Sequence, residues 1–369
     1  MRVLLAGGGT AGHINPALAI AASLKENVPG VEILFAGTPF GMEAALVPRK
    51  GYAFTPIRVK GFQRKLTAKN VLRNLQAGCY LCSSAIRARQ ILKEFRPDLV
   101  IGTGGYVSGP IVRAASKMGI KTAIHEQNAF PGITTKLLAK HVGLVMLAVK
   151  DSKRHLPQDI PVLVTGNPVR PEILTASRTE ARRSLGIPAE ALCILSYGGS
   201  LGAGKINETV LELLAWEQGY PDIYHIHGYG GMGKESFPAG LRERGLAHDA
   251  RVDAREYLGD MDACMAAADL VICRAGAITL SELQAMGRAS ILIPSPIVAE
   301  NHQYHNAMVL QKAGAAIVIE QKDLTAEKLV ETVDMLCRDR SRLDSMAQIA
   351  GSMGIRDAGD RILEALLNL

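Results

Sequence analysis

The sequence predicts an α/β protein whose two domains each contain a parallel sheet and face a common cleft. Its 369 residues are about twice the length of an average domain. Short apolar runs typical of strands alternate with helical stretches in both halves of the chain, as in sheets covered by helices on both faces. Glycine-rich loops of the phosphate-binding kind follow three of these runs, at residues 7–13, 102–106 and 198–204.

In the first half of the chain, each predicted strand is a short apolar run bounded by turn or polar residues. We expect strands at residues 3–6, 31–36, 54–57, 99–101, 122–125, 144–148 and 162–164. We expect helices at residues 16–24, 42–49 and 70–95. Connections between neighbouring parallel strands should be right-handed.

The segment from Gly166 to Pro171 is the best candidate for a domain boundary, because its two prolines disfavour both a helix and a central strand. Beyond it we expect strands at residues 192–197, 223–227, 251–253, 270–273, 290–293 and 316–319, and a helix at 206–216. Residues 356–369 have the pattern of an amphipathic helix, which we expect to pack on the first domain. The predicted domains are residues 1–164, joined by 352–369, and residues 165–351.

The composition favours a cytoplasmic protein. Six cysteines are scattered along the chain, several in apolar runs, as reduced core cysteines are. Cys79 and Cys82 have redox or zinc spacing, but no second pair accompanies them, so a structural role is favoured. Glycines and Pro16 interrupt the uncharged run near the N-terminus, which favours strand–loop–helix over a signal or membrane segment. The net charge of +7 would suit nucleic acid, an anionic membrane or an anionic ligand.

The three glycine-rich loops differ in what they could bind. Such a loop at a helix start lets backbone amides approach an anion. The first does not match a dinucleotide fingerprint, because no acidic residue ends the next strand at Ala36, and it lacks the Lys-Ser/Thr pair of a P-loop. The third, which contains Ser200 and precedes a helix, is the better phosphate site.

Two residues at strand ends are candidates for chemistry, each with a structural alternative. His13 could act as a general base or contact a phosphate, or it could hydrogen-bond to backbone at a helix start. Glu282 could accept both hydroxyls of a ribose. With Thr279 it also has the spacing of a helix capping box.

Other polar clusters follow predicted strands. Residues 125–128 and 301–306 are rich in amide side chains, which suit sugar hydroxyls because they donate and accept hydrogen bonds. Asp260 and Asp262 have the spacing of an Asp-x-Asp metal motif, but a helix N-cap and a first-turn carboxylate explain them better. No metal site is expected, and none is assigned to the alternating histidines 225 and 227.

The segment from Arg58 to Arg96 is strongly basic, with a net charge of +9 and apolar residues between the charges. This pattern is typical of an element that lies on an anionic membrane surface. A solvated basic helix is the alternative. No recognised nucleic-acid-binding module surrounds the segment, so binding to nucleic acid is not expected.

Taken in order, several motifs resemble those of the bacterial MurG family. They are GGTAGH at residues 8–13, GGYVSGP at 104–110, HEQN at 125–128, GNPVR at 166–170, GGSLGA at 198–203 and AGAITLSE at 275–282. Members of this family are peripheral membrane N-acetylglucosaminyltransferases that convert lipid I to lipid II in peptidoglycan synthesis. The resemblance covers nearly the whole chain and implies a GT-B fold, made of two Rossmann-like domains.

The resemblance also implies roles for particular residues. The candidate catalytic bases are His13 and Glu126. The second domain would bind UDP-N-acetylglucosamine (UDP-GlcNAc), and the donor-binding residues would be Thr10, Gly12, His13, Asn128, Arg170, Ser200, Leu258, Ala277, Ile278, Thr279, Glu282, Gln303 and Asn306. The first domain would bind lipid I, and the acceptor-binding residues would be Gly9, Thr10, Gly104, Gly105 and Tyr106. Ala11 and Leu201 depart from the pattern of some members.

The implied reaction is an inverting transfer that needs neither a cofactor nor a metal ion. The implied location is the cytoplasmic face of the cell membrane. Two alternatives remain open: a UDP-GlcNAc 2-epimerase of the same architecture, and a membrane-surface binding module without enzymatic activity.

Overall fold

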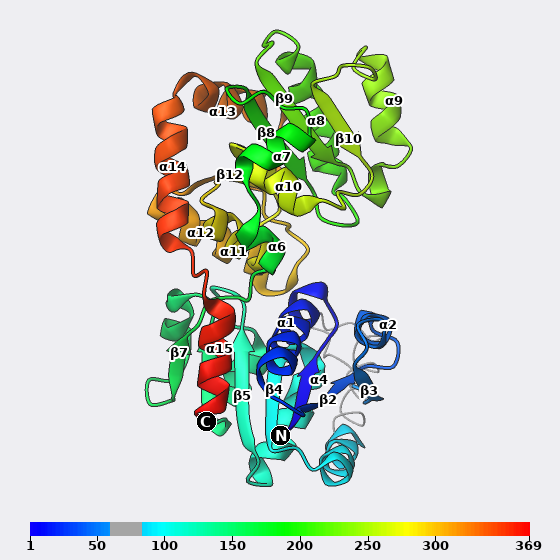
Figure 1. Cartoon of the computed structure of the whole chain (residues 1–369), viewed down its shortest axis with the longest axis vertical. Helices are drawn as coiled ribbons and strands as arrows, with labels where there is room; N and C mark the ends of the chain where they lie inside the picture. The colour runs from blue at the N-terminus through cyan, green and yellow to red at the C-terminus, as the bar shows by residue number, and fades with distance from the viewer. Residues whose placement is uncertain (60–82) are drawn as a thin grey trace. The chain divides into compact units, whose positions relative to one another are not determined.

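The computed structural model describes residues 1–59 and 83–369, which form two compact units (Figure 1). Unit 1 consists of Met1–Pro168 and Asp357–Leu369, and unit 2 of Val169–Arg356. The break after Pro168 lies inside the proline-containing segment 166–171. The domain limits expected from the sequence were 164/165 and 351/352.

Unit 1 contains a seven-stranded parallel sheet in the order β3-β2-β1-β4-β5-β6-β7. The strands are β1 (Arg2–Gly7), β2 (Glu32–Gly37), β3 (Ala53–Pro56), β4 (Leu99–Gly104), β5 (Lys121–Glu126), β6 (Leu144–Leu147) and β7 (Val162–Val164). The strand order reverses between β1 and β4. In open parallel sheets, ligands bind at the carboxyl ends of the strands on either side of such a reversal.

The helices of unit 1 lie on both faces of this sheet. They are α1 (Ala11–Asn27), α2 (Met42–Arg49), α4 (Gly105–Lys117), α5 (Ile133–Leu138), α15 (Ala358–Leu367) and a helical stretch at 83–95. Buried side chains of α1 and α15 share one apolar cluster, whereas those of 83–95 and α4 share the other. The expected return of the last helix to the first domain is therefore confirmed: Ile362 and Leu366 pack in the same core as Ile20 and Leu24. Figure 1 shows α15 beside α1.

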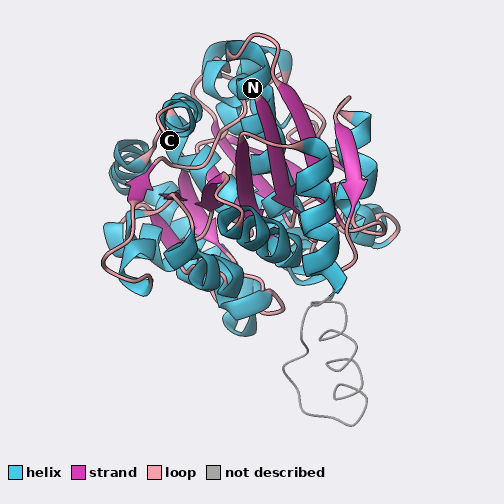
Figure 2. Cartoon of the chain, turned by 90° about the horizontal axis from the view of Figure 1, so that it is seen from below, coloured by secondary structure: helices cyan, strands magenta, loops and turns pink. Residues whose placement is uncertain are grey.

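Unit 2 contains a six-stranded parallel sheet in the order β10-β9-β8-β11-β12-β13. The strands are β8 (Leu192–Tyr197), β9 (Ile223–Gly228), β10 (Val252–Arg255), β11 (Leu270–Cys273), β12 (Ala289–Leu292) and β13 (Ala316–Val318). Its α-helices are α6 (Pro171–Thr175), α7 (Arg178–Ser184), α8 (Gly204–Glu217), α9 (Ser236–Glu243), α10 (Met261–Ala267), α11 (Ala277–Met286), α12 (His302–Ala313), α13 (Ala326–Arg338) and α14 (Arg340–Met353). Helices flank the strands (Figure 2), and the strand order reverses between β8 and β11.

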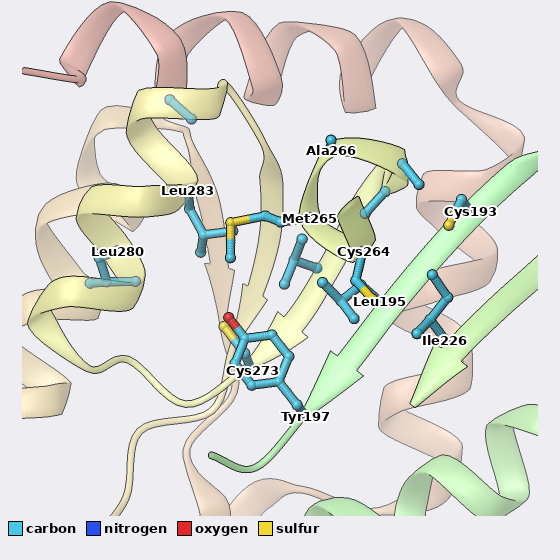
Figure 3. Packing of buried hydrophobic residues seen from close by; sticks show 14 of the residues in the cluster. Cys193, Leu195, Tyr197, Ile226, Cys264, Met265, Ala266, Cys273, Leu280 and Leu283 are labelled. Carbon is cyan, nitrogen blue, oxygen red and sulfur yellow. The ribbon is translucent and has the colours of Figure 1, made fainter. Parts of the chain in front are cut away.

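The cysteines of unit 2 behave as core residues. Cys193, Cys264 and Cys273 are buried and unpaired, and Figure 3 shows them among the apolar side chains of one cluster. Burial raises the pKa of each of these thiols to about 12. They are therefore uncharged and unreactive at neutral pH, as expected from the sequence. Cys79 and Cys82 lie outside the described residues.

Two glycine-rich loops pass into helices differently from what the sequence predicts. Helix α1 begins at Ala11 rather than at Pro16, so Pro16 lies inside it. Helix α4 begins at Gly105, directly after β4, where no helix is predicted. As a result, Gly12 and His13 lie in the first turn of α1, and Gly104 and Gly105 are the N-cap and first residue of α4.

No helix in the described parts of the chain is long and apolar enough to cross a membrane.

Arg182 holds the start of unit 2 together. Its side chain is buried, and it donates to the carbonyls of Pro188, Ala189, Ala191 and Ala267. It also pairs with Asp269 at 2.6 Å. These acceptors lie on two segments, residues 188–191 before β8 and residues 267–269 at the end of α10, so the guanidinium joins helix α7 to both.

We expect Arg182→Ala to destabilise unit 2 by about 2–4 kcal/mol, because it leaves the carbonyls of the buried Ala191 and Ala267 without this donor and removes one of the two arginine partners of the partly buried Asp269. Trp216, the single tryptophan of the chain, lies in unit 2 and reports its unfolding in denaturant by fluorescence. The neighbouring Arg183 is exposed, and Arg183→Ala should change the free energy by less than about 0.5 kcal/mol. Equal effects of the two changes would contradict the assignment.

Candidate functional site

The first two glycine-rich loops meet at the carboxyl ends of β1 and β4, where the strand order reverses. A side chain at Gly105 would overlap the carbonyl oxygen of Gly8, and one at Gly7 would overlap the hydroxyl of Thr103. Gly104 and Gly105 have φ angles of 111° and 77°, which favour glycine. Glycine is therefore required for this close approach, which places the predicted acceptor residues of both loops side by side.

Two amides of these loops already have acceptors within unit 1. Gly9 N donates to the buried carboxylate of Glu43 at 3.1 Å, and Gly104 N donates to the hydroxyl of Ser108 at 3.0 Å. Burial raises the pKa of Glu43, but hydrogen bonds from Thr38 and Gly9 outweigh it and the pKa is lowered overall. An anion at this edge would therefore rely on other amides, such as those of Ala11 and Gly12 at the start of α1, because the amides of His13 and Ile14 already donate to the carbonyl of Thr10.

His13 lies at the same edge, with its ring packed against Gly104. A side chain at Gly104 would come within 2.5 Å of His13 Nδ1, so glycine leaves room for the imidazole. The hydroxyl of Thr103 donates to the His13 carbonyl at 2.8 Å. His13 Nδ1 lies 3.1 Å from Oε1 of Gln127. The backbone and the ring of His13 are thus both held in place.

Glu126, the second candidate base, is occupied in a different way. Its carboxylate is buried and accepts hydrogen bonds from the amides of Asn128 and Gly132 and from the hydroxyl of Thr135. The side-chain amide of Asn128 also donates to it, at 3.0 Å. The carboxylate therefore organises the loop between β5 and α5, and the amide of Asn128 contributes to the same arrangement.

Unit 2 has a pocket at the carboxyl ends of its strands, with about 710 Å³ of space that is partly open to solvent. Five predicted donor-binding residues line it: Arg170, Ser200, Leu258, Thr279 and Glu282. Gly199, in the third glycine-rich loop, also lines it, whereas the sequence prediction missed Tyr197, Gly228, Glu256, Tyr257, Gly259 and Met261. The sequence did carry a signal for this side of the pocket. Glycines stand at 228, 230 and 231, directly after the strand predicted at residues 223–227.

The third glycine-rich loop forms one side of this pocket. Gly199 and Gly202 have φ angles of 95° and 82°, and a side chain at Gly202 would overlap the carbonyl oxygen of Tyr229. Gly202 N donates to the Gly199 carbonyl at 2.8 Å. This tight turn leaves Ser200 exposed at the mouth of the pocket, just before the N-terminus of α8.

Arg170 and Glu282 form an ion pair in the pocket, with 2.9 Å between Nε and Oε1. The Glu282 side chain is 7% exposed and that of Arg170 is 53% exposed, so burial removes water mainly from the carboxylate. Burial raises the pKa of Glu282, and the pairing with Arg170 offsets only part of this rise. Burial also acts to lower the pKa of Arg170, but the carboxylate outweighs it and that pKa is raised.

One capping alternative from the sequence is wrong. Helix α11 begins at Ala277 after the N-cap Gly276, so Thr279 is not at a cap position and Glu282 binds Arg170 instead of closing a capping box. The other is confirmed in position: Asp260 is the N-cap residue of α10 and Asp262 lies in its first turn, although the Asp260 carboxylate accepts from Arg255 at 2.7 Å and not from a helix amide.

The remaining predicted donor residues of unit 2 do not line the pocket. Ala277 and Ile278 form the first turn of α11, next to the pocket residue Thr279. Gln303 accepts a hydrogen bond from Ser295 N at 2.8 Å, and Asn306 is buried and donates to Ala275 O at 3.4 Å. The Gln303 side chain thus holds the backbone that follows β12, and the Asn306 side chain holds the backbone that follows β11.

The histidines 225 and 227 belong to a buried network rather than to a metal site. Ser196 Oγ lies 2.6 Å from a ring nitrogen of each, and His225 Nδ1 lies 2.8 Å from Glu217. Burial holds the pKa of His227 well below its ordinary value. Among the described residues, no group of three or more His, Cys, Asp and Glu is arranged to hold a metal ion.

Comparison with known proteins places the chain among glycosyltransferases. The Glycosyltransferase family 28 N-terminal domain matches residues 3–146, and the C-terminal domain of the same family matches residues 193–362. A protein of Acetivibrio thermocellus is 46% identical over 369 residues, which cover 100% of this chain and 98% of the relative. It is named UDP-N-acetylglucosamine--N-acetylmuramyl-(pentapeptide) pyrophosphoryl-undecaprenol N-acetylglucosamine transferase. A protein of the same name from Thermoanaerobacter sp. is 43% identical over 100% of both chains.

Solved structures agree with this placement. The crystal structure of Acinetobacter baumannii MurG is similar with a TM-score of 0.81 and 30% identity, covering 100% of this chain and 99% of that one. UDP-GlcNAc 2-epimerase from Neisseria meningitidis, solved with UDP-GlcNAc bound, gives a TM-score of 0.67 over 100% of both chains. Because its identity is 17%, that likeness extends to the fold alone.

Proposed function

Because the chain belongs to the MurG family of glycosyltransferases, we infer that it transfers N-acetylglucosamine from UDP-GlcNAc to the muramyl-pentapeptide of pyrophosphoryl-undecaprenol, lipid I. The products are lipid II and UDP. The observation that carries this conclusion is the 41% to 46% identity over the full chain with transferases of this name. The GT-B fold, with two parallel-sheet α/β domains, agrees with it. The same relatives favour the transferase over the epimerase.

The pocket of unit 2 supports a site for the nucleotide part of the donor. Leu258 and Met261 offer an apolar wall for a base, and the Glu282 carboxylate can accept hydrogen bonds from ribose hydroxyls. Ser200, the amides at the start of α8 and Arg170 would meet the diphosphate. Ala277, Ile278, Gln303, Asn306, Thr10, Gly12 and Asn128 complete the proposed donor set.

Unit 1 would bind the acceptor diphosphate through Gly9, Thr10, Gly104, Gly105 and Tyr106. His13 would then act as the base: its ring nitrogen takes the proton of the 4-hydroxyl of the muramyl sugar as that oxygen attacks the anomeric carbon. The bond from that carbon to the diphosphate breaks, and its electron pair leaves with UDP. His13 is preferred to Glu126, because the Glu126 carboxylate already accepts four hydrogen bonds.

The charge that develops on the leaving diphosphate would be stabilised by the loop amides, the dipole of α8 and Arg170. This stabilisation of the leaving diphosphate can take the place of a metal ion. We expect full activity in excess EDTA, and a strict requirement for Mg²⁺ would contradict this part of the proposal.

Incubation with UDP-GlcNAc, with and without lipid I, tests the function. UDP release only in the presence of lipid I, together with formation of lipid II, supports the transferase. Isomerisation of UDP-GlcNAc without lipid would support the epimerase. Lipid binding without turnover would support a membrane-binding module.

We further propose that the protein lies on the cytoplasmic face of the cell membrane and contacts anionic lipid through the basic segment from Arg58 to Arg96. Residues 60–82 of this segment lie outside the described residues. Within its described part, Ile86 is 62% exposed on the helical stretch that also carries Arg89 and Lys93. Apolar residues among basic ones suit a membrane surface.

Replacing Arg89 and Lys93 together with glutamine should weaken binding to anionic vesicles by roughly tenfold or more, since each basic residue near such a surface contributes about 1 kcal/mol. Co-sedimentation with vesicles containing phosphatidylglycerol measures this. As a control, replacing the exposed Arg183 and Lys312 of unit 2 with glutamine removes the same amount of charge. This change should have little effect on binding to anionic vesicles. Equal binding to zwitterionic vesicles would refute the electrostatic contact.

A further inference from the structure

Two buried residues, His125 and Gln127, lie behind His13 in unit 1 and have no place in the mechanism above. Their side chains form one line of hydrogen bonds that begins at the carbonyl of Gly166 and ends at the His13 ring. His125 is 1% exposed and Gln127 is 2% exposed. The line lies wholly within unit 1.

The first link fixes the proton of His125. Its Nε2 lies 2.9 Å from the carbonyl oxygen of Gly166, which can only accept, so Nε2 carries the hydrogen. Burial lowers the pKa of His125, against the opposing effects of Gly166 and Glu126, which keeps the ring neutral. Its Nδ1 therefore has a lone pair and accepts.

The second link fixes the orientation of the Gln127 amide. Gln127 Nε2 lies 3.0 Å from His125 Nδ1 and 2.8 Å from the His125 carbonyl oxygen. Both of these atoms are acceptors, so the nitrogen of the amide must face them. The oxygen, Oε1, then faces His13.

The third link fixes the proton of His13. Oε1 of Gln127 can only accept, so His13 Nδ1, 3.1 Å away, must carry a hydrogen. In the neutral imidazole the lone pair is then on Nε2. The contact with Gly104 and the bond from Thr103 to the His13 backbone keep the ring in this position.

We infer that Gln127 is a positioning residue for the transfer: it holds His13 as the Nδ1–H tautomer, so that the Nε2 lone pair is free to take the proton of the acceptor hydroxyl. This inference rests on the proposed role of His13 as general base. An amide suits the task, because its oxygen can only accept a hydrogen bond and it adds no negative charge beside the ring, whereas a carboxylate would favour the imidazolium form that cannot accept a proton.

The tautomer of the wild-type protein is the first test. Long-range ¹H–¹⁵N spectra of protein labelled with ¹⁵N-histidine distinguish the two tautomers, and the spectrum of His13→Gln identifies the His13 signals. At a pH where the ring is neutral we expect the Nδ1–H form. An Nε2–H form in the wild type overturns the inference, and this measurement needs no variant of Gln127.

Gln127→Met keeps the length of the side chain but cannot accept at Oε1. We expect the His13 signals to shift toward a mixture of tautomers, and kcat to fall about 10-fold to 100-fold. The KM for UDP-GlcNAc should change by less than about twofold, because the loss acts on the chemical step. Gln158→Met, at an exposed position of unit 1 outside the basic segment, is the matched control and should leave both quantities unchanged.

A fall in kcat without a change of tautomer would mean that Gln127 acts only on structure, and would overturn the inference. Full activity of Gln127→Met or of His13→Ala would also overturn it. Failure of the proposed function is distinguishable from these outcomes, because it would appear as absence of GlcNAc transfer to lipid I by the wild-type protein.

Discussion

Replacing His13 with alanine should lower kcat for transfer to lipid I by about 10²–10⁴-fold, the usual contribution of a positioned general base. The structure gives two reasons. The ring lies at the carboxyl ends of β1 and β4, next to the glycines proposed to bind the acceptor, and its position is fixed by Gly104 and Gln127. Initial rates of UDP release at saturating lipid I measure the change.

Comparison with two further variants makes this result specific. His141→Ala removes an exposed histidine of the same unit and should leave kcat unchanged. Glu126→Gln should disturb the loop between β5 and α5, seen as a lower unfolding temperature, because the carboxylate accepts four hydrogen bonds there. Near-normal turnover of His13→Ala combined with an inactive but stable Glu126→Gln would reverse the assignment of the base.

Glu282→Gln should weaken binding of UDP by about 10-fold to 100-fold, which corresponds to the 1.5–3 kcal/mol of hydrogen bonds to a charged group. The carboxylate is buried in the pocket of unit 2 and pairs with Arg170. The amide of glutamine keeps one acceptor oxygen, but the change removes the other proposed acceptor for the ribose hydroxyls and the negative charge that pairs with Arg170. Isothermal titration with UDP gives the dissociation constant directly.

The pH dependence of the same measurement has a definite sign. Because burial raises the pKa of Glu282 above its ordinary value, protonation on acidification should begin at a higher pH than for an exposed glutamate. Affinity for UDP should therefore fall as the pH falls through this raised pKa, and the fall should be absent in Glu282→Gln. Glu172→Gln, which removes an exposed carboxylate near Arg170, should change affinity less than about twofold.

Apolar runs were enough to place most strands. Residues 192–197 and 270–273 form strands with the limits expected from the sequence, because both runs are buried throughout their length. Helix starts were harder. Pro16 is favoured at the first position of a helix, yet α1 starts at Ala11 and tolerates Pro16 inside. Here the packing of the glycine loop against Gly105, a residue far along the chain, overrides local preference.

Site residues could be predicted where a strand end was polar or rich in glycine. They could not be predicted where the interaction joins residues that lie far apart in the sequence. Ser200 and Glu282 were placed from motifs and Leu258 from the family resemblance, and all three line the pocket. The pairing of Arg170 with Glu282 joins residues 112 positions apart, and no local pattern indicates it. Tyr197 was missed because it ends a strand as one more apolar residue, although it lines the pocket as well.

Helix α15 comes last in the chain but completes the core of unit 1, where it packs on α1, the helix that begins next to His13. During synthesis, unit 2 therefore leaves the ribosome entire before unit 1 has all of its parts. Domains generally fold as units, so residues 1–168 must wait with an uncovered apolar face on α1 until residues 357–369 arrive. The half of the molecule that is proposed to bind the acceptor would then become competent only after residues 357–369 have been made.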